Sequence, residues 1–370
     1  MRFEEVIGQE KAKQQLGRMV QANRMPHALM MQGPHGSGKL SLAHGLAQYV
    51  LCRDRKEGDS CGKCSDCVKT EKLIHPDLHF SFPVVGSKAT SDDFMSQWRS
   101  AMLDLPYFGI NDWLQRIGAD NQQGNIGKDE CVRIMRRFSL KTYEGSHKVL
   151  IMWLAEYLGK EGNRLLKLIE EPPQGSLFIL ISDEPEKVLN TIRSRCQLVN
   201  LQPLGDGEVI AGLKRHFSIG EEEAKRISRL ADGDFCEAAR LADQRENDNA
   251  RLFLEWMRTC YKGNGVQLVK WVDAFSGLGR ENQKHFLRYA LHFLREFTYL
   301  SVGGSEPPRL GDKEAKTAQN MMKVMKFEQV EKIARMLDEC YHYVERNANP
   351  KILFLDTSIR MHKILLDRRS

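Results

Sequence analysis

Over the first two hundred residues, short continuous apolar runs alternate with amphipathic segments. Four runs have the length of strands: HALMMQG (27–33), KVLIMWL (148–154), SLFILIS (176–182) and CQLVNLQPL (196–204). A run that is apolar at every position, without alternation, is typical of a parallel strand that is covered on both faces. Alternating strands and helices predict an α/β fold in which helices cover both faces of a parallel sheet.

The helical periodicity is clearest directly after the first strand and again after residue 203. KLSLAHGLAQYVL (39–51) places apolar residues on one side of a helix, and GNRLLKLIEEPP (162–173) reads as a helix stopped by its two prolines. After Pro203 the strands stop. Residues 205–248 read as a small helical unit, and 249–370 as helical almost throughout.

A polar stretch from about 84 to 127 interrupts the strand–helix rhythm. It contains PVVGSKATSDD and GADNQQGNIG, which are loop-like segments around a helix. We interpret this stretch as an insertion, and the sequence gives it no role.

Composition and charge narrow the class of protein only slightly. The 370 residues are 41% hydrophobic and 28% charged, and their formal net charge is +6. No apolar run reaches the ~18 residues that a membrane span needs, and MRFEEVIGQE lacks the apolar core of a secretory signal. We therefore expect a cytoplasmic protein with no membrane partner. The charge is compatible with a nucleic-acid neighbour but does not require one.

The strand at 27–33 leads into a glycine-rich loop and then a helix, which is the context of a phosphate-binding loop. Gly33 and Gly38–Lys39 have the spacing of that motif, with Gly36 inside the loop. Backbone N–H groups of such a loop surround phosphates, and the helix N-terminus adds favourable partial charge. Lys39 is expected to reach the terminal phosphates of a nucleotide.

The residues that would handle magnesium are missing from this loop and from the strand at 148–154. Leu40 stands where a Ser or Thr hydroxyl binds Mg²⁺, and Ser41 comes one residue late. Trp153 and Leu154 stand where an ATPase carries its acidic pair, and Glu156 lies two residues further on. The pattern predicts a degenerate site that binds no Mg²⁺ and does not hydrolyse ATP, while binding of ATP or ADP remains open.

Four cysteines form a tight cluster, C-x8-C-x2-C-x2-C, at Cys52, Cys61, Cys64 and Cys67. Four thiolates at this spacing suit tetrahedral Zn²⁺, and four protein ligands make such a site structural rather than catalytic. An iron–sulfur cluster and reduced thiols without metal are the alternatives.

Taken together, these segments resemble the AAA+ subunits of bacterial clamp loaders over essentially the full chain. The resemblance rests on FEEVIGQEKAKQQL, PHALMMQGPHGSGK, the cysteine cluster, HPDLHF, NRLLKLIEEPP and TIRSRCQ. Among these subunits the chain is most similar to the delta-prime type, whose nucleotide site is typically degraded. The resemblance implies an AAA+ domain at 1–204 with an inserted zinc module at about 52–67, a helical lid at 205–248 and a helical collar for assembly at 249–370.

The resemblance also assigns roles to particular residues. Ser194, Arg195 and Cys196 match a Ser-Arg-Cys element whose arginine points into the ATP site of the neighbouring subunit. An arginine finger of this kind stabilises the charge that develops on the phosphates. Cys236 matches a lid position at which active members carry a phosphate-binding arginine, so this contact is lost as well.

These features predict a non-hydrolysing clamp-loader subunit that acts with the delta and gamma/tau subunits of DNA polymerase III. Through that complex its partners would be the sliding clamp and primed DNA. An active gamma/tau-type ATPase is the alternative. A zinc-containing nucleic-acid-binding protein without a motor partner is less favoured, because CGKCSDCVKTEK (61–72) is mixed in charge and lacks aromatic residues.

Overall fold

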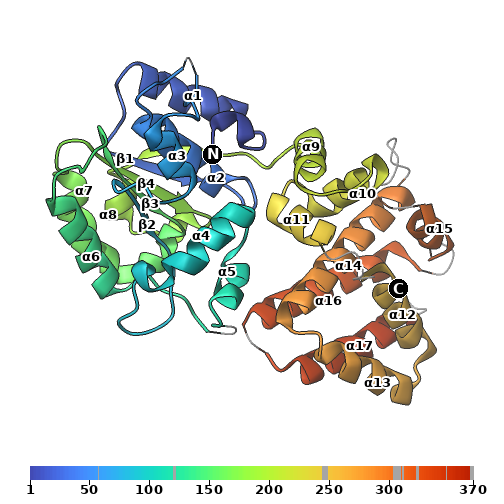
Figure 1. The fold of residues 1–370 in the computed structure, drawn as a ribbon. Helices are drawn as coiled ribbons and strands as arrows, with labels where there is room; N and C mark the ends of the chain where they lie inside the picture. Colours follow the sequence, from blue (N-terminus) through green and yellow to red (C-terminus); the bar gives the residue numbers. More distant parts are fainter. Residues whose placement is uncertain are drawn as a thin grey trace. The chain divides into compact units, whose positions relative to one another are not determined.

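The computed structural model describes residues 1–370 except 57, 120–121, 244–248, 303–309, 311, 322–324, 347 and 367–370. It divides into two compact units, Met1–Asp243 and Gln244–Ser370. Figure 1 shows strands enclosed by helices in the first unit and helices alone in the second.

A five-stranded parallel sheet forms the centre of the first unit, in the order β2-β3-β4-β1-β5. Its strands are β1 (Ala28–Gln32), β2 (Leu78–Ser81), β3 (Lys148–Met152), β4 (Ser176–Ser182) and β5 (Gln197–Asn200). The predicted parallel α/β architecture is therefore confirmed, and the four apolar runs supply β1, β3, β4 and β5. Strand β2, which begins in HPDLHF (75–80) and ends at Ser81, was not predicted.

The helices of the first unit lie on both faces of this sheet and beyond it. They are α1 (Glu10–Gln21), α2 (Lys39–Leu51), α3 (Ser65–Glu71), α4 (Met95–Asp104), α5 (Ile110–Arg116), α6 (Lys128–Ser139), α7 (Leu166–Glu170), α8 (Asn190–Arg193), α9 (Asp206–His216), α10 (Glu221–Ala231) and α11 (Phe235–Asp243). Short 3₁₀ segments are η1 (Phe3–Glu5), η2 (Ser91–Phe94), η3 (Ala155–Leu165) and η4 (Pro185–Lys187). The segment 162–173, for which a helix was predicted, is divided between two elements. It is 3₁₀ up to Leu165, in η3, and α-helical from Leu166 to Glu170, in α7, which ends before the prolines.

The polar stretch at 84–127 is part of the main core rather than a loose excursion. Its two tryptophans, Trp98 and Trp113, are 0% and 1% exposed, and their rings lie 5.2 Å apart. Trp98 also stacks on Phe82, at 4.1 Å between ring centroids. An antiparallel bridge between Val84 and Asn125 closes the base of the stretch. Buried aromatic rings therefore hold a segment whose overall composition is polar.

Helices α9–α11 form a second hydrophobic cluster within the first unit. Their buried residues pack together with Ile7 from the N-terminal turn and Tyr107 from the 84–127 stretch. The ring of Phe235, at the start of α11, is fully buried in this cluster. The division of this unit into a sheet domain at 1–204 and a lid remains a prediction.

The second unit consists of helices in the residues that the structure describes. They are α12 (Asn249–Lys262), α13 (Gly265–Ser276), α14 (Arg280–Ser301), α15 (Asp312–Met321), α16 (Phe327–Glu345) and α17 (Pro350–Leu366). Trp256 and Trp271 stack at 5.1 Å, and Trp256 donates a 2.8 Å hydrogen bond to Ser358 Oγ. Among the described residues, no helix of either unit combines the length and apolar character that crossing a membrane requires.

Candidate functional site

The glycine-rich loop connects β1 to α2, where the sequence predicts it. Gly38 caps α2 in the left-handed conformation, with φ 84° and ψ 21°. Gly36 also has a positive φ, 68°, and its carbonyl accepts a hydrogen bond from the backbone N–H of Phe235. A Cβ atom added at Gly36 would lie 1.9 Å from Asp234 Oδ1. The loop therefore packs directly against the start of α11, at a distance that only glycine allows.

Lys39, the first residue of α2, is held by the chain's own oxygen atoms. Its ammonium donates to the carbonyls of Gly33, at 2.8 Å, and Pro34, and forms a 2.8 Å ion pair with Asp183. The Lys39 side chain is 5% exposed. A lysine in a phosphate-binding loop normally presents its charge to the ligand, and here carbonyls and a carboxylate receive it.

The positions that the sequence identified as lost magnesium ligands lie in the hydrophobic core. Leu40 is 5%, Trp153 4% and Leu154 3% exposed. The ring of Trp153 lies 5.4 Å from that of Trp98 and 5.2 Å from that of Phe108. These apolar side chains offer no oxygen to a cation and exclude water from the positions they fill.

Two carboxylates nevertheless lie near the loop, at the ends of β3 and β4. Asp183 directly follows β4, and its backbone N–H donates to Glu156 Oε1 at 3.1 Å. Burial raises the pKa of Glu156, and the neighbouring Asp183 charge adds to that shift. Glu156 stands near the expected acidic positions in the sequence, whereas Asp183 was not predicted. The one available signal was its position after a buried parallel strand, where ligands of such sheets bind.

His35, Asp234 and Cys236 connect the loop to α11. His35 Nδ1 lies 2.7 Å from Asp234 Oδ2, and the potential ligand atoms of all three residues lie within 4.8 Å of one another. Burial opposes the charge on His35, but the hydrogen bond with Asp234 and its charge outweigh it and raise the pKa of His35. Burial raises the pKa of the Cys236 thiol well above its usual value. Cys236 is therefore a neutral, half-buried thiol beside an ion pair.

The four clustered cysteines come together, and none forms a disulfide. The Sγ atoms of Cys52 and Cys64 lie 3.9 Å apart, as do those of Cys61 and Cys67. Tetrahedral zinc with Zn–S bonds of about 2.3 Å requires S–S separations of about 3.8 Å, so the donor set fits this metal. Burial opposes ionisation of Cys61, but the N–H groups of Lys63 and Cys64 outweigh it and lower its pKa to about 7.

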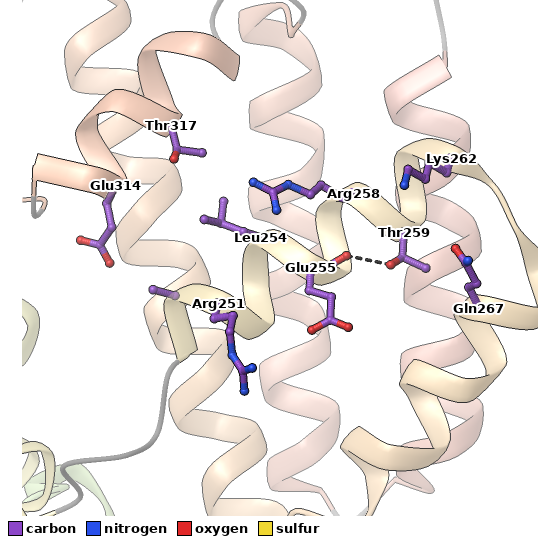
Figure 2. A pocket seen from close by; sticks show the side chains of 10 residues that line it. Arg251, Leu254, Glu255, Arg258, Thr259, Lys262, Gln267, Glu314 and Thr317 are labelled. Carbon is purple, nitrogen blue, oxygen red and sulfur yellow. Dashed lines mark hydrogen bonds between the residues drawn. The ribbon is translucent and has the colours of Figure 1, made fainter.

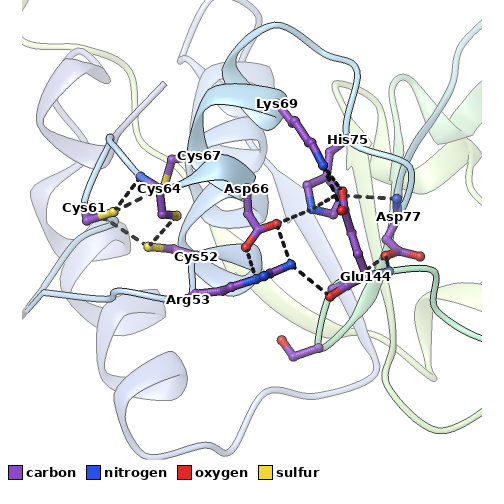
Figure 3. A network of polar contacts seen from close by, with 12 residues as sticks. Cys52, Arg53, Cys61, Cys64, Asp66, Cys67, Lys69, His75, Asp77 and Glu144 are labelled. Carbon is purple, nitrogen blue, oxygen red and sulfur yellow. Dashed lines mark hydrogen bonds and ion pairs between the residues drawn. The ribbon is translucent and has the colours of Figure 1, made fainter.

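A polar network links this cluster to the HPDLHF segment, and Figure 3 shows the two side by side. Asp66, between two of the cysteines, forms a 2.6 Å ion pair with Arg53 and lies 3.4 Å from His75 Nε2. Lys69 binds both carboxylate oxygens of Glu144, at 2.7 and 2.8 Å. The potential ligand atoms of Asp66, His75 and Glu144 lie within 4.8 Å of one another. Arg53 and Lys69 already neutralise the carboxylates of Asp66 and Glu144, so this network needs no metal ion to balance its charge.

Asp77, from the same segment, fixes the turn that precedes β3. Its carboxylate accepts backbone N–H bonds from Tyr143, Glu144 and Gly145, at 2.7–2.9 Å. Burial opposes its ionisation, but these hydrogen bonds outweigh it and lower the pKa of Asp77. The motif thus positions the edge of the sheet beside the cysteine cluster.

The Ser194–Cys196 segment follows the short helix α8 and precedes β5. Arg195 is exposed: its guanidinium donates to the carbonyl of Thr191 at 2.7 Å and pairs with Glu170. Its side chain is 37% exposed. Cys196 is buried, and burial raises the pKa of its thiol to about 11. The buried Cys196 therefore fixes the end of this segment in the core, while the side chain of Arg195 faces solvent.

A separate pocket of about 510 Å³ lies in the second unit, between α12, α13 and α15. Figure 2 shows Arg251, Arg258 and Lys262 along α12, with Glu255 and Glu314 in the same lining. The lining thus combines three cations with two carboxylates.

Comparison with known proteins shows similarity to two kinds of DNA polymerase III subunit. The delta-prime subunit of Escherichia coli is 27% identical over 213 residues, 58% of this chain and 53% of that protein. The delta-prime subunit of Bacillus subtilis is 28% identical, over 50% of this chain and 45% of that protein. The gamma/tau subunit of Mycobacterium tuberculosis is 31% identical over 52% of this chain and 27% of that protein.

The similarity to the two delta-prime subunits thus spans about half of their length. Among solved structures, a gamma subunit-related protein of DNA polymerase III from Thermotoga maritima aligns with a TM-score of 0.40 and 13% identity, over 96% of this chain and 99% of that one. A family model described as "DNA polymerase III, delta subunit" matches residues 8–205, more than half of the 370 residues. The chain therefore belongs to this family of DNA polymerase III clamp-loader subunits.

Proposed function

We propose that the chain is a non-hydrolysing clamp-loader subunit of the delta-prime type. It would assemble with delta and gamma/tau subunits, donate Arg195 to the ATP site of a neighbouring subunit, and support the loading of a sliding clamp onto primed DNA. In this role the chain is not itself an ATPase, and it carries out no polymerase chemistry.

The burial of Leu40, Trp153 and Leu154 carries the proposal. Hydrolysis of ATP in a phosphate-binding loop requires a hydroxyl and an acid to hold Mg²⁺. All three positions are instead apolar and at most 5% exposed. A rotamer change cannot restore the missing oxygen atoms, so the loop supports a scaffold role better than a catalytic one.

The geometry of Arg195 supports its assignment as the arginine finger. A finger must leave its own subunit and reach the phosphates of another nucleotide. Arg195 is exposed on a short turn that buried Ile192 and Cys196 hold in place. Its pairing with Glu170 is a surface ion pair, worth about 0–1 kcal/mol, which phosphate oxygens can replace.

The decisive experiment is ATPase activity of the chain alone and in complex with its motor subunits. We expect no turnover by the chain alone above that of a Lys39→Ala control. In the complex, Arg195→Ala should lower turnover by about 10³-fold at the affected site, by analogy with other arginine fingers. Arg193→Ala, two residues away on α8, is the matched control. Lys39-dependent turnover by the chain alone would overturn the proposal.

An active gamma/tau-type ATPase is the second candidate, and two observations favour it. The gamma/tau relative is 31% identical to the chain. Asp183, directly after β4, also pairs with Lys39, and Glu156, in η3, accepts a hydrogen bond from the backbone of Asp183. If the chain is an active ATPase, Asp183→Asn should abolish ATP turnover by the chain alone. If it is a delta-prime-type subunit, the chain alone has no ATP turnover before or after the substitution.

We also propose that Cys52, Cys61, Cys64 and Cys67 hold a structural zinc ion. Metal analysis of the purified chain should find about one zinc per chain, because four thiolates complete its coordination. Substitution of Cys61 and Cys64 by Ser should remove the metal, while Cys236→Ser should leave it in place. Full zinc content in the double variant would refute this assignment.

A further inference from the structure

The 84–127 stretch, to which the sequence gives no role, sends one aromatic side chain to the glycine-rich loop. After α4, residues 105–109 pass over the start of α2, where Ser41 Oγ donates a 3.0 Å hydrogen bond to the carbonyl of Pro106. The next residue, Tyr107, is 5% exposed. The stretch therefore contacts the nucleotide-binding region directly.

Three separate parts of the first unit surround the Tyr107 side chain. Its hydroxyl accepts a 3.0 Å hydrogen bond from the backbone N–H of Ile7. Its ring lies edge-to-face with that of Phe235, at 4.8 Å between centroids. On the loop side, a Cβ atom added at Gly38 would lie 3.2 Å from Tyr107 Cε1. The ring thus fills the space between the loop, the N-terminal turn and α11.

This space has the properties that the base of a nucleotide requires. The base of a nucleotide whose phosphates lie on the loop has to find a place beside the loop, and the space next to Gly38 is one such place. A purine is a flat ring that needs apolar walls and a backbone hydrogen bond to its polar edge. The aromatic ring of Phe235 and the N–H of Ile7 provide these two features, and Tyr107 uses both of them.

We infer that Tyr107 is an internal plug that occupies the slot for a purine base, so that the chain's own aromatic ring excludes a nucleotide from the loop. The inference rests on the proposed function, since a permanently filled site suits a subunit that serves a neighbour's ATP. It gives the 84–127 stretch a role: its buried tryptophans hold the plug in position.

The surroundings of the ring show what its removal would open. Tyr107 also lines a pocket of about 390 Å³, together with Asp112, His216, Cys236 and Arg240. The same side chain therefore borders this pocket and approaches Gly38. Tyr107→Ala would join the pocket to the loop and leave the N–H of Ile7 without its acceptor.

The test is nucleotide binding by the full chain, measured calorimetrically without added Mg²⁺. Wild type should not bind ADP measurably, and Tyr107→Ala should bind it at least tenfold more tightly than wild type. Adenosine should show the same gain. Pyrophosphate, which lacks a base, should show none. Tyr143→Ala is the matched control, because Tyr143 is 82% exposed and remote in sequence from the loop.

Two further variants keep the test decisive. Tyr107→Leu retains part of the apolar volume, so it should fold even if the alanine variant does not, and it should show a smaller gain for ADP. Tyr107→Phe keeps the ring and should bind no better than wild type. Near-ultraviolet circular dichroism verifies that each variant is folded.

Equal ADP binding by wild type and a folded Tyr107→Ala or Tyr107→Leu variant would overturn the plug. A gain for pyrophosphate equal to that for ADP would overturn it as well. Wild type that binds ADP without hydrolysing ATP would refute the plug and leave the proposed function intact. ATP turnover by the chain alone would instead refute the proposed function.

Discussion

The glycine-rich loop and the Ser194–Cys196 segment both carry a cation suited to phosphate, but the protein holds the two cations very differently. Lys39 is 5% exposed and satisfied by two carbonyls and the Asp183 carboxylate. Arg195 is 37% exposed and pairs with Glu170 at the surface. Lys39 is bound by groups of its own chain in a buried position, whereas Arg195 can exchange its surface partner Glu170 for another anion at little cost in free energy.

The difference follows from the energetics of charge burial. Removing one member of a buried pair leaves an uncompensated charge, which costs several kcal/mol, whereas most surface pairs are worth less than about 1 kcal/mol. A cation that must act on another subunit therefore belongs at the surface. The contrast between the two regions can be tested by substitutions whose expected effect on the free energy of unfolding ranges from large to almost none.

The largest loss of stability is expected when an acid is restored to the core beside the loop. Trp153→Asp removes ring contacts with Trp98 and Phe108 and buries an unpaired carboxylate, so it should cost about 4–5 kcal/mol or more. Urea denaturation measures the loss, with Trp153→Phe as a milder control. A stable Asp variant with Mg²⁺-dependent ATPase activity would show that the position is an open metal site.

Removal of the buried Lys39 ammonium should cause the next largest loss of stability. Lys39→Ala leaves the Asp183 carboxylate and two carbonyls without their donor, and should lower the free energy of unfolding by about 3 kcal/mol. Asp183 is a quarter exposed, so the cost lies at the lower end for a buried pair. Lys11→Ala, at an exposed position on α1, should change stability by less than about 0.5 kcal/mol. Equal denaturation midpoints for the two variants would contradict the prediction.

The ion pair between His35 and Asp234, which joins the loop to α11, should make a smaller and pH-dependent contribution to stability. The pKa of His35 is raised, so its contribution is complete below about 6.5 and is lost as pH rises through the folded-state pKa. Burial opposes ionisation of Asp234, but His35 outweighs it and lowers its pKa. The Asp234 contribution is therefore present above about 3.8 and is lost in stronger acid.

The stability difference between wild type and His35→Asn should therefore be largest between about pH 4 and pH 6.5 and decrease on the alkaline side. Thermal melts from pH 5 to pH 9 measure it. A difference that grows above pH 7 would show that the neutral imidazole, not the ion pair, joins the two elements.

The smallest effect on stability is expected at the exposed cation. Arg195→Ala and Glu170→Gln should each change the free energy of unfolding by at most about 1 kcal/mol, because the pair is solvent-exposed. Glu170→Gln should also leave ATP turnover by the complex at or above the wild-type level, since it only releases Arg195. A loss of stability as large as that of Lys39→Ala would indicate a structural role for Arg195.

Periodicity alone predicted most of the sheet and the helix after the loop. The apolar runs became β1, β3, β4 and β5. For β1, β3 and β4 the reason is that a parallel strand buried on both faces must be apolar at nearly every position. Strand β5 lies at the edge of the sheet, and of its four residues only Val199 is buried. Strand β2 was missed because the polar His79 interrupts the apolar pattern of LHFS. Its place in the sheet comes from pairing with β3, which is distant in sequence.

Predictions for the site were limited in the same way. Leu40 and Trp153 were recognised because they stand at fixed positions of a local motif. Asp183, Asp234 and Tyr107 reach the loop from distant parts of the chain, so no spacing in the sequence reports them. Polar composition suggested an insertion at 84–127 but not how it packs, which a few buried aromatic residues decide.

The position of β1 between β4 and β5 has a consequence for synthesis of the chain on the ribosome. Both of its neighbours are made much later: Ala28 pairs with Phe178 of β4, and Leu29 with Gln197 of β5. At about 5–20 residues per second, some 150 residues of further translation take roughly 8–30 s. During that interval β1 has no strand to pair with. Helix α2, which is made directly after β1 and packs against it, is the element that can shield its apolar face until β4 emerges.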